Sequence, residues 1–304
     1  MIINQSLCTG IFPNRLKIAK VLPLFKKGDI YYFDNYRPIS LLPTVSKIFE
    51  KVVYKQLYDY FSKNSLIYKS QYGFRHLHST ELAALELADR LSSNLDDGEI
   101  PITIFLDLSK AFDTLDHKIL LSKLKYYGLS ESALQWFSSY LTDRLQYIHV
   151  EGTDSNMLPI STGVPQGSVL GPLLFLIYMN DVSEASDKLH SILFADDTTL
   201  TNPICSFDLS TSNNKFDKTK ISESINQELH KIFEWLAVNK LSLNVAKTKF
   251  MLFHYRQRNI DDIVPNLAIN GHIIERVHEF NFLGIIFDEH LDWKQHRQKV
   301  ANKI

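Results

Sequence analysis

Apolar residues recur with two different periods along this chain, and each period predicts a different kind of element. Spacings of three and four residues predict helices at 45–61, 80–95, 119–127, 132–141 and 221–239. Short runs rich in β-branched and aromatic residues predict strands at 100–108, 147–150, 157–161, 191–195, 198–200, 241–243, 248–253 and 282–287. Residues 1–36 are predicted to form extended segments and turns. Because helices and strands alternate irregularly, the pattern predicts a mixed α/β or α+β fold rather than a doubly wound sheet.

Two glycine-rich or polar segments interrupt this pattern. Residues 163–172 are predicted to be a loop that enters a helix running to about residue 179. Residues 201–220 are rich in Ser, Thr, Asn, Lys and Asp, which predicts an inserted polar loop. No internal repeat is seen.

Composition excludes several classes of protein. The chain has 304 residues, of which 45% are hydrophobic and 22% charged, as in an ordinary soluble protein. Its longest apolar run, 173–179, is too short to span a bilayer, and its first residues do not resemble a signal peptide. Two cysteines are too few for a disulfide scaffold, which favours an intracellular protein of the cytoplasm or nucleus. The eleven histidines show no metal-ligand spacing such as HExxH, so zinc is not expected.

The net charge of −1 hides an uneven distribution. Residues 1–75 contain twelve Lys or Arg against four Asp or Glu, so the rest of the chain carries −9. A basic front part is typical of a groove that binds a polyanion, and it is equally well explained by scattered, solvated lysines.

Two adjacent acids stand between apolar runs in SILFADDTTL (191–200), where Asp196 and Asp197 are predicted to form the turn of a hairpin. Carboxylates this close oppose each other's ionisation unless a cation lies between them. A solvated turn is the alternative for this pair taken alone. A third acid, Asp107, directly follows the apolar strand 102–106, where an unpaired carboxylate is costly. If the strand lies beside the hairpin, the three acids converge into a site for two cations and phosphoryl transfer.

Five motifs then occur in order along the chain, and together they resemble the reverse transcriptases of non-LTR (LINE-type) retrotransposons, especially the jockey-like group. They are YRPISLL (36–42), FLDLSKAFDTLDH (105–117), GVPQGSVLGPLLF (163–175), FADD (194–197) and LNVAKTK (243–249). The resemblance runs from about residue 21 to residue 293. It implies a right-hand polymerase fold of class α+β with fingers and palm, and with the thumb missing or truncated.

The resemblance assigns the catalytic positions residue by residue. Asp107, Asp196 and Asp197 match the family's metal-binding carboxylates, which implies two Mg²⁺ ions, with Mn²⁺ as a substitute. Lys247 matches a lysine proposed to assist the departure of pyrophosphate, although a lysine in a turn beside a strand is usually just solvated.

Further matches concern the incoming nucleotide. Arg37 resembles the arginine that reaches the triphosphate, and its planar fork suits phosphate oxygens. Lys26 or Lys27 is an assisting group or an ordinary turn lysine. Gln166 matches a glutamine near the nucleotide sugar, beside Gly167, where a glycine allows close backbone approach or simply a tight loop. 

Phe112 matches the bulky residue that excludes a 2′-hydroxyl and so selects dNTP over rNTP. A buried aromatic residue after a strand end is the plain structural alternative for Phe112.

Two other segments have family counterparts. The FLG sequence at 282–284 resembles a hairpin that grips the primer, or is only an edge of the palm. Residues 71–75 (QYGFR) match a fingers segment near the template, where aromatic and basic groups stack bases and contact phosphates. Asp113, Asp116 and His117 suggest acid–base chemistry at first sight, but they are expected to cap or orient the helix that starts near residue 118.

The resemblance also predicts the organisation and function. Fingers are expected at about 1–100 and 118–156, and palm at about 101–117 and 157–304 with the 201–220 insertion. The expected function is RNA-directed DNA polymerisation, with an RNA template, a DNA primer and dNTPs as partners and no membrane. The chain ends about where a thumb would begin and lacks the family's endonuclease, so it is expected to be a fragment. The alternative is a silent element remnant that binds RNA without copying it.

Overall fold

The computed structural model describes residues 2–206 and 217–303. The chain divides into two compact units. The first unit comprises residues 1–67 and 110–179, and the second comprises residues 68–109 and 180–304. The middle of the predicted 201–220 loop lies outside the described residues. Its ends differ from the prediction, because 201–203 continue a strand and 218–220 begin a helix.

The first unit contains a five-stranded sheet in the order β2-β1-β5-β6, with β7 also paired to β5. Its strands are β1 (Ile18–Phe25), β2 (Tyr36–Leu41), β5 (Arg144–Val150), β6 (Thr153–Asp154) and β7 (Leu158–Ile160). Strands β1 and β2 form an antiparallel pair in which Arg37 lies opposite Leu24. This pairing places the predicted phosphate-binding arginine on an edge strand, where it is exposed.

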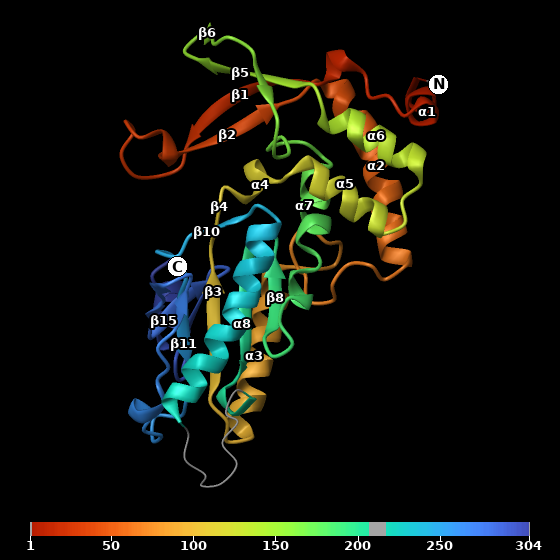
Figure 1. The fold of residues 1–304 in the computed structure, drawn as a ribbon. Coiled ribbons are helices and arrows are strands. Elements are labelled where there is room, and N and C mark those ends of the chain that lie inside the picture. The colour runs from red at the N-terminus through yellow and green to blue at the C-terminus, as the bar shows by residue number, and fades with distance from the viewer. Residues whose placement is uncertain (1, 207–216, 304) are drawn as a thin grey trace. The chain divides into compact units, whose positions relative to one another are not determined.

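Helices form the rest of the first unit (Figure 1). They are α1 (Ile2–Thr9), α2 (Thr44–Lys63), α4 (Ala111–Thr114), α5 (His117–Tyr126), α6 (Glu131–Leu141) and α7 (Gly171–Met179), with short 3-10 turns η1 (Asn14–Leu16) and η2 (Phe33–Asn35). Every residue of α7 except Pro172 is buried, which explains why its sequence is apolar on all sides. Asp116 is the N-cap of α5 and accepts hydrogen bonds from the N–H groups of Lys118 and Ile119, as predicted.

Helix α1 contradicts the prediction that residues 1–36 are only extended segments and turns. Its stability comes from tertiary contacts, because Trp136 Nε1 donates a 3.0 Å hydrogen bond to Ser6 Oγ and Ser6 itself is buried. Just beyond the helix, the Phe12 ring packs edge-on against Phe49, Trp136 and Tyr140. A helix of eight residues is marginal alone, so local sequence carries little sign of it.

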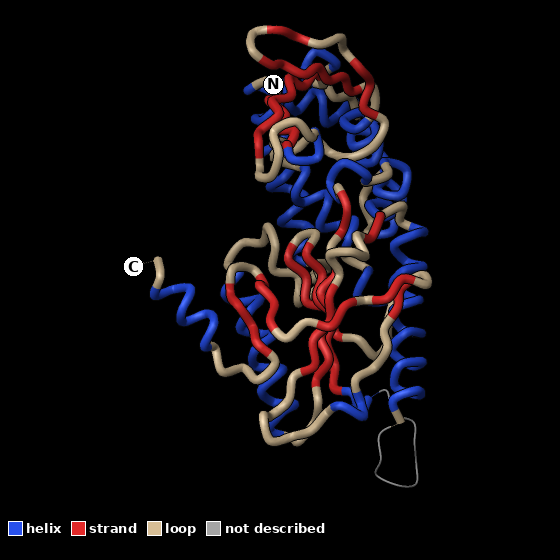
Figure 2. The backbone as a smooth tube through the Cα atoms, turned by 90° about the vertical axis from the view of Figure 1, so that its left-hand side faces the viewer, coloured by secondary structure: helices blue, strands red, loops and turns tan. Residues whose placement is uncertain are grey.

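The second unit is built on a five-stranded sheet in the order β14-β11-β3-β9-β8. Its strands are β3 (Pro101–Leu106), β8 (His190–Phe194), β9 (Asp197–Pro203), β11 (Lys249–Leu252) and β14 (Glu275–Arg276). All six residues of the central strand β3 are buried, so both faces of the sheet are covered. Figures 1 and 2 show the covering helices, α3 (Thr80–Asp96) on one face and α8 (Lys218–Val238) on the other.

Small elements complete the second unit. They are the strand pairs β4 (Leu108–Ser109) with β10 (Ser242–Leu243), β12 (Ala268–Ile269) with β13 (His272–Ile273), and β15 (Glu279–Phe282) with β16 (Ile285–Asp288), the 3-10 turns η3 (Val182–Glu184), η4 (Ile204–Ser206) and η5 (Asp261–Ile263), and α9 (Lys294–Ala301). The predicted single strand 282–287 is wrong. Leu283 and Gly284 both adopt positive φ angles, 49° and 95°, and this turn folds the segment back into the β15–β16 hairpin.

In the described residues, helices and antiparallel-rich sheets are thus combined without a regular βαβ repeat, which confirms the predicted α+β class. The helices predicted at 45–61, 80–95, 119–127, 132–141 and 221–239 are all present within a few residues of the predicted ends.

Candidate active site

The register of two neighbouring strands brings two of the predicted acids face to face. Strands β3 and β9 are antiparallel, and their last pair is Leu106 with Thr198. The next residue on each strand is an aspartate, so Asp107 and Asp197 lie opposite each other at the same end of the sheet. Sequence alone gave no means to fix this pairing across 89 intervening residues.

The third acid is in the turn that joins β8 to β9. Phe194 pairs with Asp197, which leaves Ala195 and Asp196 as the two turn residues. Ala195 has a φ of 57°. The predicted turn was therefore one residue out of place, because Asp197 is the first residue of β9 rather than part of the turn. Asp197 on the strand lies opposite Asp107, and Asp196 in the turn directly precedes Asp197.

A buried glutamine that was not predicted to contribute to this site holds the turn in place. Gln71 is 1% exposed, and its Oε1 accepts hydrogen bonds from the N–H groups of Ala195 (3.1 Å) and Gly73 (2.8 Å). The N–H of Tyr72 also donates to the carbonyl oxygen of Leu193 at 2.7 Å. The segment matched to a template-binding region thus lies along the outer edge of β8, with its glutamine supporting the turn that carries Asp196.

The three acids make a strongly negative environment. Burial, followed by the charges of Asp196 and Asp107, raises the pKa of Asp197 from 3.8 to about 6. Asp197 is still exposed on one side, so solvent screens part of this repulsion. Lys247 Nζ lies 3.4 Å from Asp107 Oδ2, and offsets one of the negative charges.

A short turn after β10 brings Lys247 to this position. The N–H of Asn244 donates to the carbonyl oxygen of Asp107 at 2.8 Å. The N–H of Lys247 in turn donates to the carbonyl oxygen of Asn244 at 3.2 Å. The predicted catalytic lysine is therefore an immediate neighbour of the first acid.

Whether these residues suit a divalent cation follows from their chemistry. Hard cations such as Mg²⁺ prefer carboxylate oxygens, which the three aspartates supply. Burial, followed by repulsion from the other two acids, raises the pKa of Asp197, and a bound cation would offset that repulsion. Among the described residues, it is His254, Glu289 and His290 whose ligand atoms all lie within 4.8 Å of one another. The oxygens of the three aspartates are not gathered as closely as that. The aspartates therefore fit a cation by charge and backbone placement, with side-chain rotation needed to close around it.

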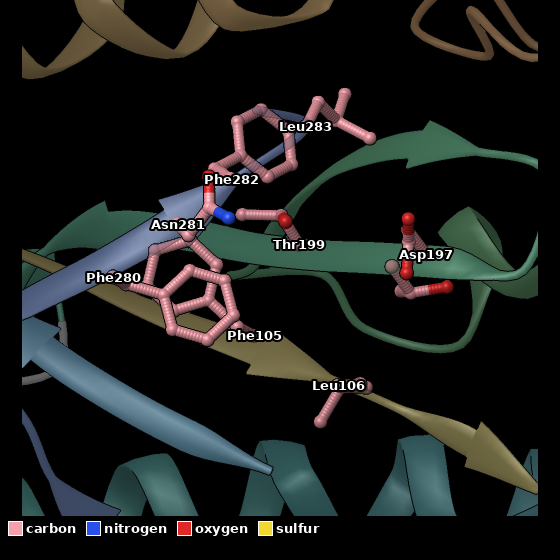
Figure 3. Close-up of a pocket in the computed structure, with 9 residues that line it drawn as sticks. Phe105, Leu106, Asp197, Thr199, Phe280, Asn281, Phe282 and Leu283 are labelled. Carbon is pink, nitrogen blue, oxygen red and sulfur yellow. The ribbon is translucent and has the colours of Figure 1, made fainter. Parts of the chain in front are cut away.

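A small pocket of about 70 Å³ adjoins this end of the sheet. Figure 3 shows Asp197 among its lining residues together with side chains of the β15–β16 hairpin. Phe280 stacks on Phe105 of the central strand, with ring centroids 3.9 Å apart. Phe282, the last residue of β15, and Leu283 in the turn also line the pocket. The hairpin matched to the primer-gripping element is thus attached to the sheet beside one of the acids.

Four predicted nucleotide-binding residues belong to the first unit, and three of these are on or beside the loop at 163–171. Phe112 stacks on Phe175 of α7, with centroids 4.2 Å apart and planes at 21°. Gln166 Nε2 donates a 2.8 Å hydrogen bond to Asp113 Oδ1. Burial raises the pKa of Asp113, and the hydrogen bond from Gln166 opposes that rise. Asp113 therefore orients Gln166 rather than capping α5.

At Gly167 in this loop, the backbone of strand β2 approaches too closely for any side chain. At Gly167, φ is 122°, and an added Cβ would lie 2.6 Å from the carbonyl oxygen of Ser40. The N–H of Ser40 in turn donates to the carbonyl oxygen of Gln166 at 2.7 Å. The loop is therefore fixed against strand β2, the strand that carries Arg37.

A buried acid that the sequence pattern does not indicate, Glu50, supports the same loop. Glu50, on α2, is fully buried, and its Oε2 accepts the N–H groups of Val169 (2.6 Å) and Leu170 (3.2 Å). Ser46 donates to its other oxygen at 3.0 Å. An acid beside the apolar positions of an amphipathic helix was the only signal, and it is a weak one.

Comparison with known proteins identifies the chain. Residues 25–287 match the family of reverse transcriptases (RNA-dependent DNA polymerases). This chain belongs to the reverse transcriptase family. The resemblance inferred from the five motifs is thereby confirmed.

Similar curated proteins come from insect transposable elements. This reverse transcriptase chain is 29% identical over 308 residues to the RNA-directed DNA polymerase from mobile element jockey of Drosophila funebris, covering 97% of the chain and 31% of that protein. It is also 29% identical over 317 residues to the probable RNA-directed DNA polymerase from transposon BS of Drosophila melanogaster, covering 100% of the chain and 33% of that protein. The chain therefore spans about a third of the length of these relatives.

Solved structures share the fold. The reverse transcriptase chain superposes on apo telomerase from Candida tropicalis, truncated from the C-terminal domain, with a TM-score of 0.55 at 14% identity, covering 93% of the chain and 55% of that structure. At this identity the likeness concerns the fold alone. The part of the chain that the structure describes contains no helix long and apolar enough to cross a membrane.

Proposed function

We propose that this chain is the polymerase part of a non-LTR retrotransposon protein and adds dNTPs to a primer 3′-end on an RNA template. The observation that carries the proposal is the register of β3 and β9, which sets Asp107 opposite Asp197 with Asp196 in the adjoining turn. Membership of the reverse transcriptase family and similarity to RNA-directed DNA polymerases from mobile elements support the same reaction. In this proposal the fingers and palm have the limits expected from the motifs.

The proposal assigns the metal chemistry to the three aspartates. Asp107, Asp196 and Asp197 would hold two Mg²⁺ ions, or Mn²⁺ in their place. Bound divalent ions lower the pKa of an attacking hydroxyl and neutralise charge on a leaving pyrophosphate. The chain's own contribution is to fix these carboxylates on rigid backbone, because β3, β9 and the turn held by Gln71 set their positions before any ligand binds.

Lys247 has a defined place in this scheme. Its ammonium group, beside Asp107, would neutralise or protonate the leaving pyrophosphate. The ion pair with Asp107 also holds the ammonium group of Lys247 beside the three aspartates, where its positive charge would act on the leaving group.

The residues of the first unit are assigned to the nucleotide. Arg37 would bind triphosphate oxygens, and its exposed guanidinium is compatible with that role. Phe112, fixed by its stacking on Phe175, would exclude a 2′-hydroxyl. Gln166 and Gly167 would approach the sugar, with Asp113 holding the glutamine amide.

Primer extension tests the proposal. The chain is assayed with a DNA primer on an RNA template, dNTPs and Mg²⁺, as the unaltered protein and as Asp196→Asn. Loss of a metal-binding carboxylate is expected to lower incorporation by about 10²-fold or more. Asp187→Asn is the matched control, because its side chain is 92% exposed and the change removes the same charge.

The outcomes separate the proposal from its alternative. Incorporation that survives Asp196→Asn would contradict the assignment of the acids. An unaltered chain that binds template RNA but incorporates no dNTP would favour a silent, RNA-binding remnant.

A further inference from the structure

A second cluster of metal-ligand side chains lies in the second unit, where β11 and the β15–β16 hairpin end. His254 follows β11, and Glu289 and His290 follow β16. The two segments are joined by backbone, since the N–H of His254 donates to the carbonyl oxygen of Glu289 at 3.0 Å. The N–H of Glu289 donates to the carbonyl oxygen of His278 at 3.1 Å. These bonds hold three side chains from separate parts of the sequence at one place.

The hydrogen bonds of the two imidazoles determine which ring nitrogen carries a hydrogen. His254 Nδ1 lies 3.1 Å from the carbonyl oxygen of Tyr255, and His290 Nδ1 lies 3.0 Å from that of His254. A carbonyl oxygen only accepts, so in both rings Nδ1 must be the donor. In the neutral ring Nε2 then carries a lone pair, which is the form that binds a metal ion.

Both Nε2 atoms are directed toward the same carboxylate. His254 Nε2 is 3.8 Å from Glu289 Oε2, and His290 Nε2 is 3.9 Å from Glu289 Oε1. The two rings are nearly perpendicular, at 84°, with centroids 4.7 Å apart. One ligand atom from each residue lies within 4.8 Å of the other two. Ligands of a tetrahedral zinc ion are roughly 3.4 Å apart. The two nitrogen–oxygen distances need to shorten by only about half an ångström, and the 4.8 Å limit on the group means that side-chain rotation about the Cα–Cβ bonds closes the rest.

The surroundings also suit a metal ion. The Nδ1–H bonds to carbonyl oxygens orient both rings in the way that outer partners orient zinc ligands. Glu289 Oε2 accepts hydrogen bonds from Arg276 (3.0 Å) and His278 (2.8 Å), which fix the carboxylate. His254 is 8% exposed, and the side chains of Glu289 and His290 are 16% and 21% exposed.

We propose that His254, Glu289 and His290 bind one Zn²⁺ ion. Two imidazoles and a carboxylate are ligands that zinc prefers, whereas Mg²⁺ prefers an all-oxygen set. The site is distinct from the three aspartates and would serve structure, by tying the end of β11 to the end of the hairpin whose tip lines the Asp197 pocket. Spacing along the sequence did not reveal it, because a backbone hydrogen bond between distant segments brings His254 and Glu289 together.

Ordinary ion pairing between the histidines and Glu289 explains the cluster less well. At 3.8 and 3.9 Å, the Nε2–oxygen separations exceed hydrogen-bond length. The glutamate meanwhile already accepts shorter bonds from Arg276 and His278. The two rings are thus placed beside the carboxylate without using it as a hydrogen-bond acceptor.

Zinc titration of the whole chain against a chromophoric chelator tests the proposal. Excess Mg²⁺ is present throughout, and the titration is repeated with Asp196→Asn, so that the aspartate cluster does not contribute. We expect one Zn²⁺ per chain. Removal of a ligand in His254→Ala or His290→Ala is expected to weaken binding by about 10²-fold or more. His272→Ala, which removes an exposed histidine from β13, is the control and should bind zinc as the unaltered chain does.

A spectroscopic measurement on the unaltered chain keeps the test valid if a variant fails to fold. With Co²⁺ in place of Zn²⁺, the proposal predicts two strongly shifted, exchangeable ring N–H proton resonances, one from each Nδ1–H. The absence of a stoichiometric zinc site in the unaltered chain would overturn the proposal. Unchanged zinc affinity in the double variant His254→Ala, His290→Ala, or a Co²⁺ spectrum without imidazole N–H signals, would also overturn it. None of these readouts depends on polymerase activity.

Discussion

Replacing Glu86 by glutamine tests how the segment that supports the Asp196 turn is anchored. Glu86 lies on α3, and its side chain is 21% exposed. Its Oε1 accepts hydrogen bonds from His190 Nε2 (2.8 Å) and Ser70 Oγ (2.9 Å), and its Oε2 accepts one from the Tyr72 hydroxyl. One carboxylate thus joins α3 to strand β8 and to the segment that contains Gln71.

The pKa of Glu86 gives the magnitude. Burial alone would raise this pKa, but the hydrogen bonds from His190, Tyr72 and Ser70 outweigh burial and lower it from 4.5 to about 2. At about 1.4 kcal/mol per pKa unit, the ionised form is stabilised on folding by about 3 kcal/mol. Glutamine keeps the shape and one acceptor but not the charge. We therefore expect Glu86→Gln to lower the free energy of unfolding at pH 7 by about 2–3 kcal/mol.

The pH dependence has a definite sign. Because the folded pKa is below the unfolded one, the stabilisation is complete above pH 4.5 and is lost as the pH falls toward 2. About half of it should be gone near pH 3. The glutamine variant lacks this titration, so the difference in stability between the two proteins should shrink over that range.

Urea unfolding followed by circular dichroism at pH 7, 5 and 3 measures this difference. Glu223→Gln, an exposed glutamate on α8, is the control and should stay within about 0.5 kcal/mol of the unaltered chain. A loss for Glu86→Gln below about 0.5 kcal/mol at pH 7, or a loss that is the same at pH 7 and pH 3, would refute the reasoning.

Two further substitutions test the supports of the site. Gly73→Ala would place a Cβ 2.3 Å from the backbone nitrogen of Ala195, so we expect a loss of stability of about 1–3 kcal/mol and reduced primer extension. Gly98→Ala is the control, because its added Cβ meets open space at a φ of 75°. It should cost about 1 kcal/mol in the same unfolding assay and leave primer extension unchanged. Equal effects of Gly73→Ala and Gly98→Ala would contradict the predicted contact between the Cβ at position 73 and Ala195. In Glu50→Gln a single side-chain oxygen remains, whereas the Ser46 hydroxyl and the Val169 N–H now donate to two separate oxygens of Glu50. We expect the free energy of unfolding to fall by about 1–3 kcal/mol, and the melting temperature to fall with it. An unchanged melting temperature would show that the 163–171 loop does not depend on Glu50.

Much of the molecule could be predicted from local sequence. The long amphipathic helices α2, α3 and α8 were found because their apolar residues recur over four turns or more, which leaves little ambiguity. The apolar run before Asp107 correctly predicted a buried strand ending at an acid. The five motifs were enough to identify the family, since each is a contiguous stretch whose order along the chain is itself informative.

Features set by contacts distant in sequence could not be predicted. Helix α1 was missed because Trp136 stabilises it from another part of the chain. At the β15–β16 hairpin the apolar pattern alone predicts one strand, since the turn contains only one glycine and no polar residue, whereas the family resemblance at 282–284 implies a hairpin. The exact turn residues before Asp197 depended on the β8–β9 register, which an apolar pattern specifies only to within a residue.

The sequence by itself determined which residues have the chemistry for binding a cation, approaching a ligand with the backbone or capping a helix. They are the acids after apolar strands, the glycine-rich loop and the capping aspartate. Only the tertiary structure decided which of them meet. Asp107 faces Asp197 because two strands pair in one register, Gln71 reaches the Ala195 turn because its segment lies along β8, and His254 meets Glu289 because their backbones are hydrogen-bonded. Residue type is a local property of the chain, whereas proximity depends on strand pairing and burial, which are settled by the whole fold at once.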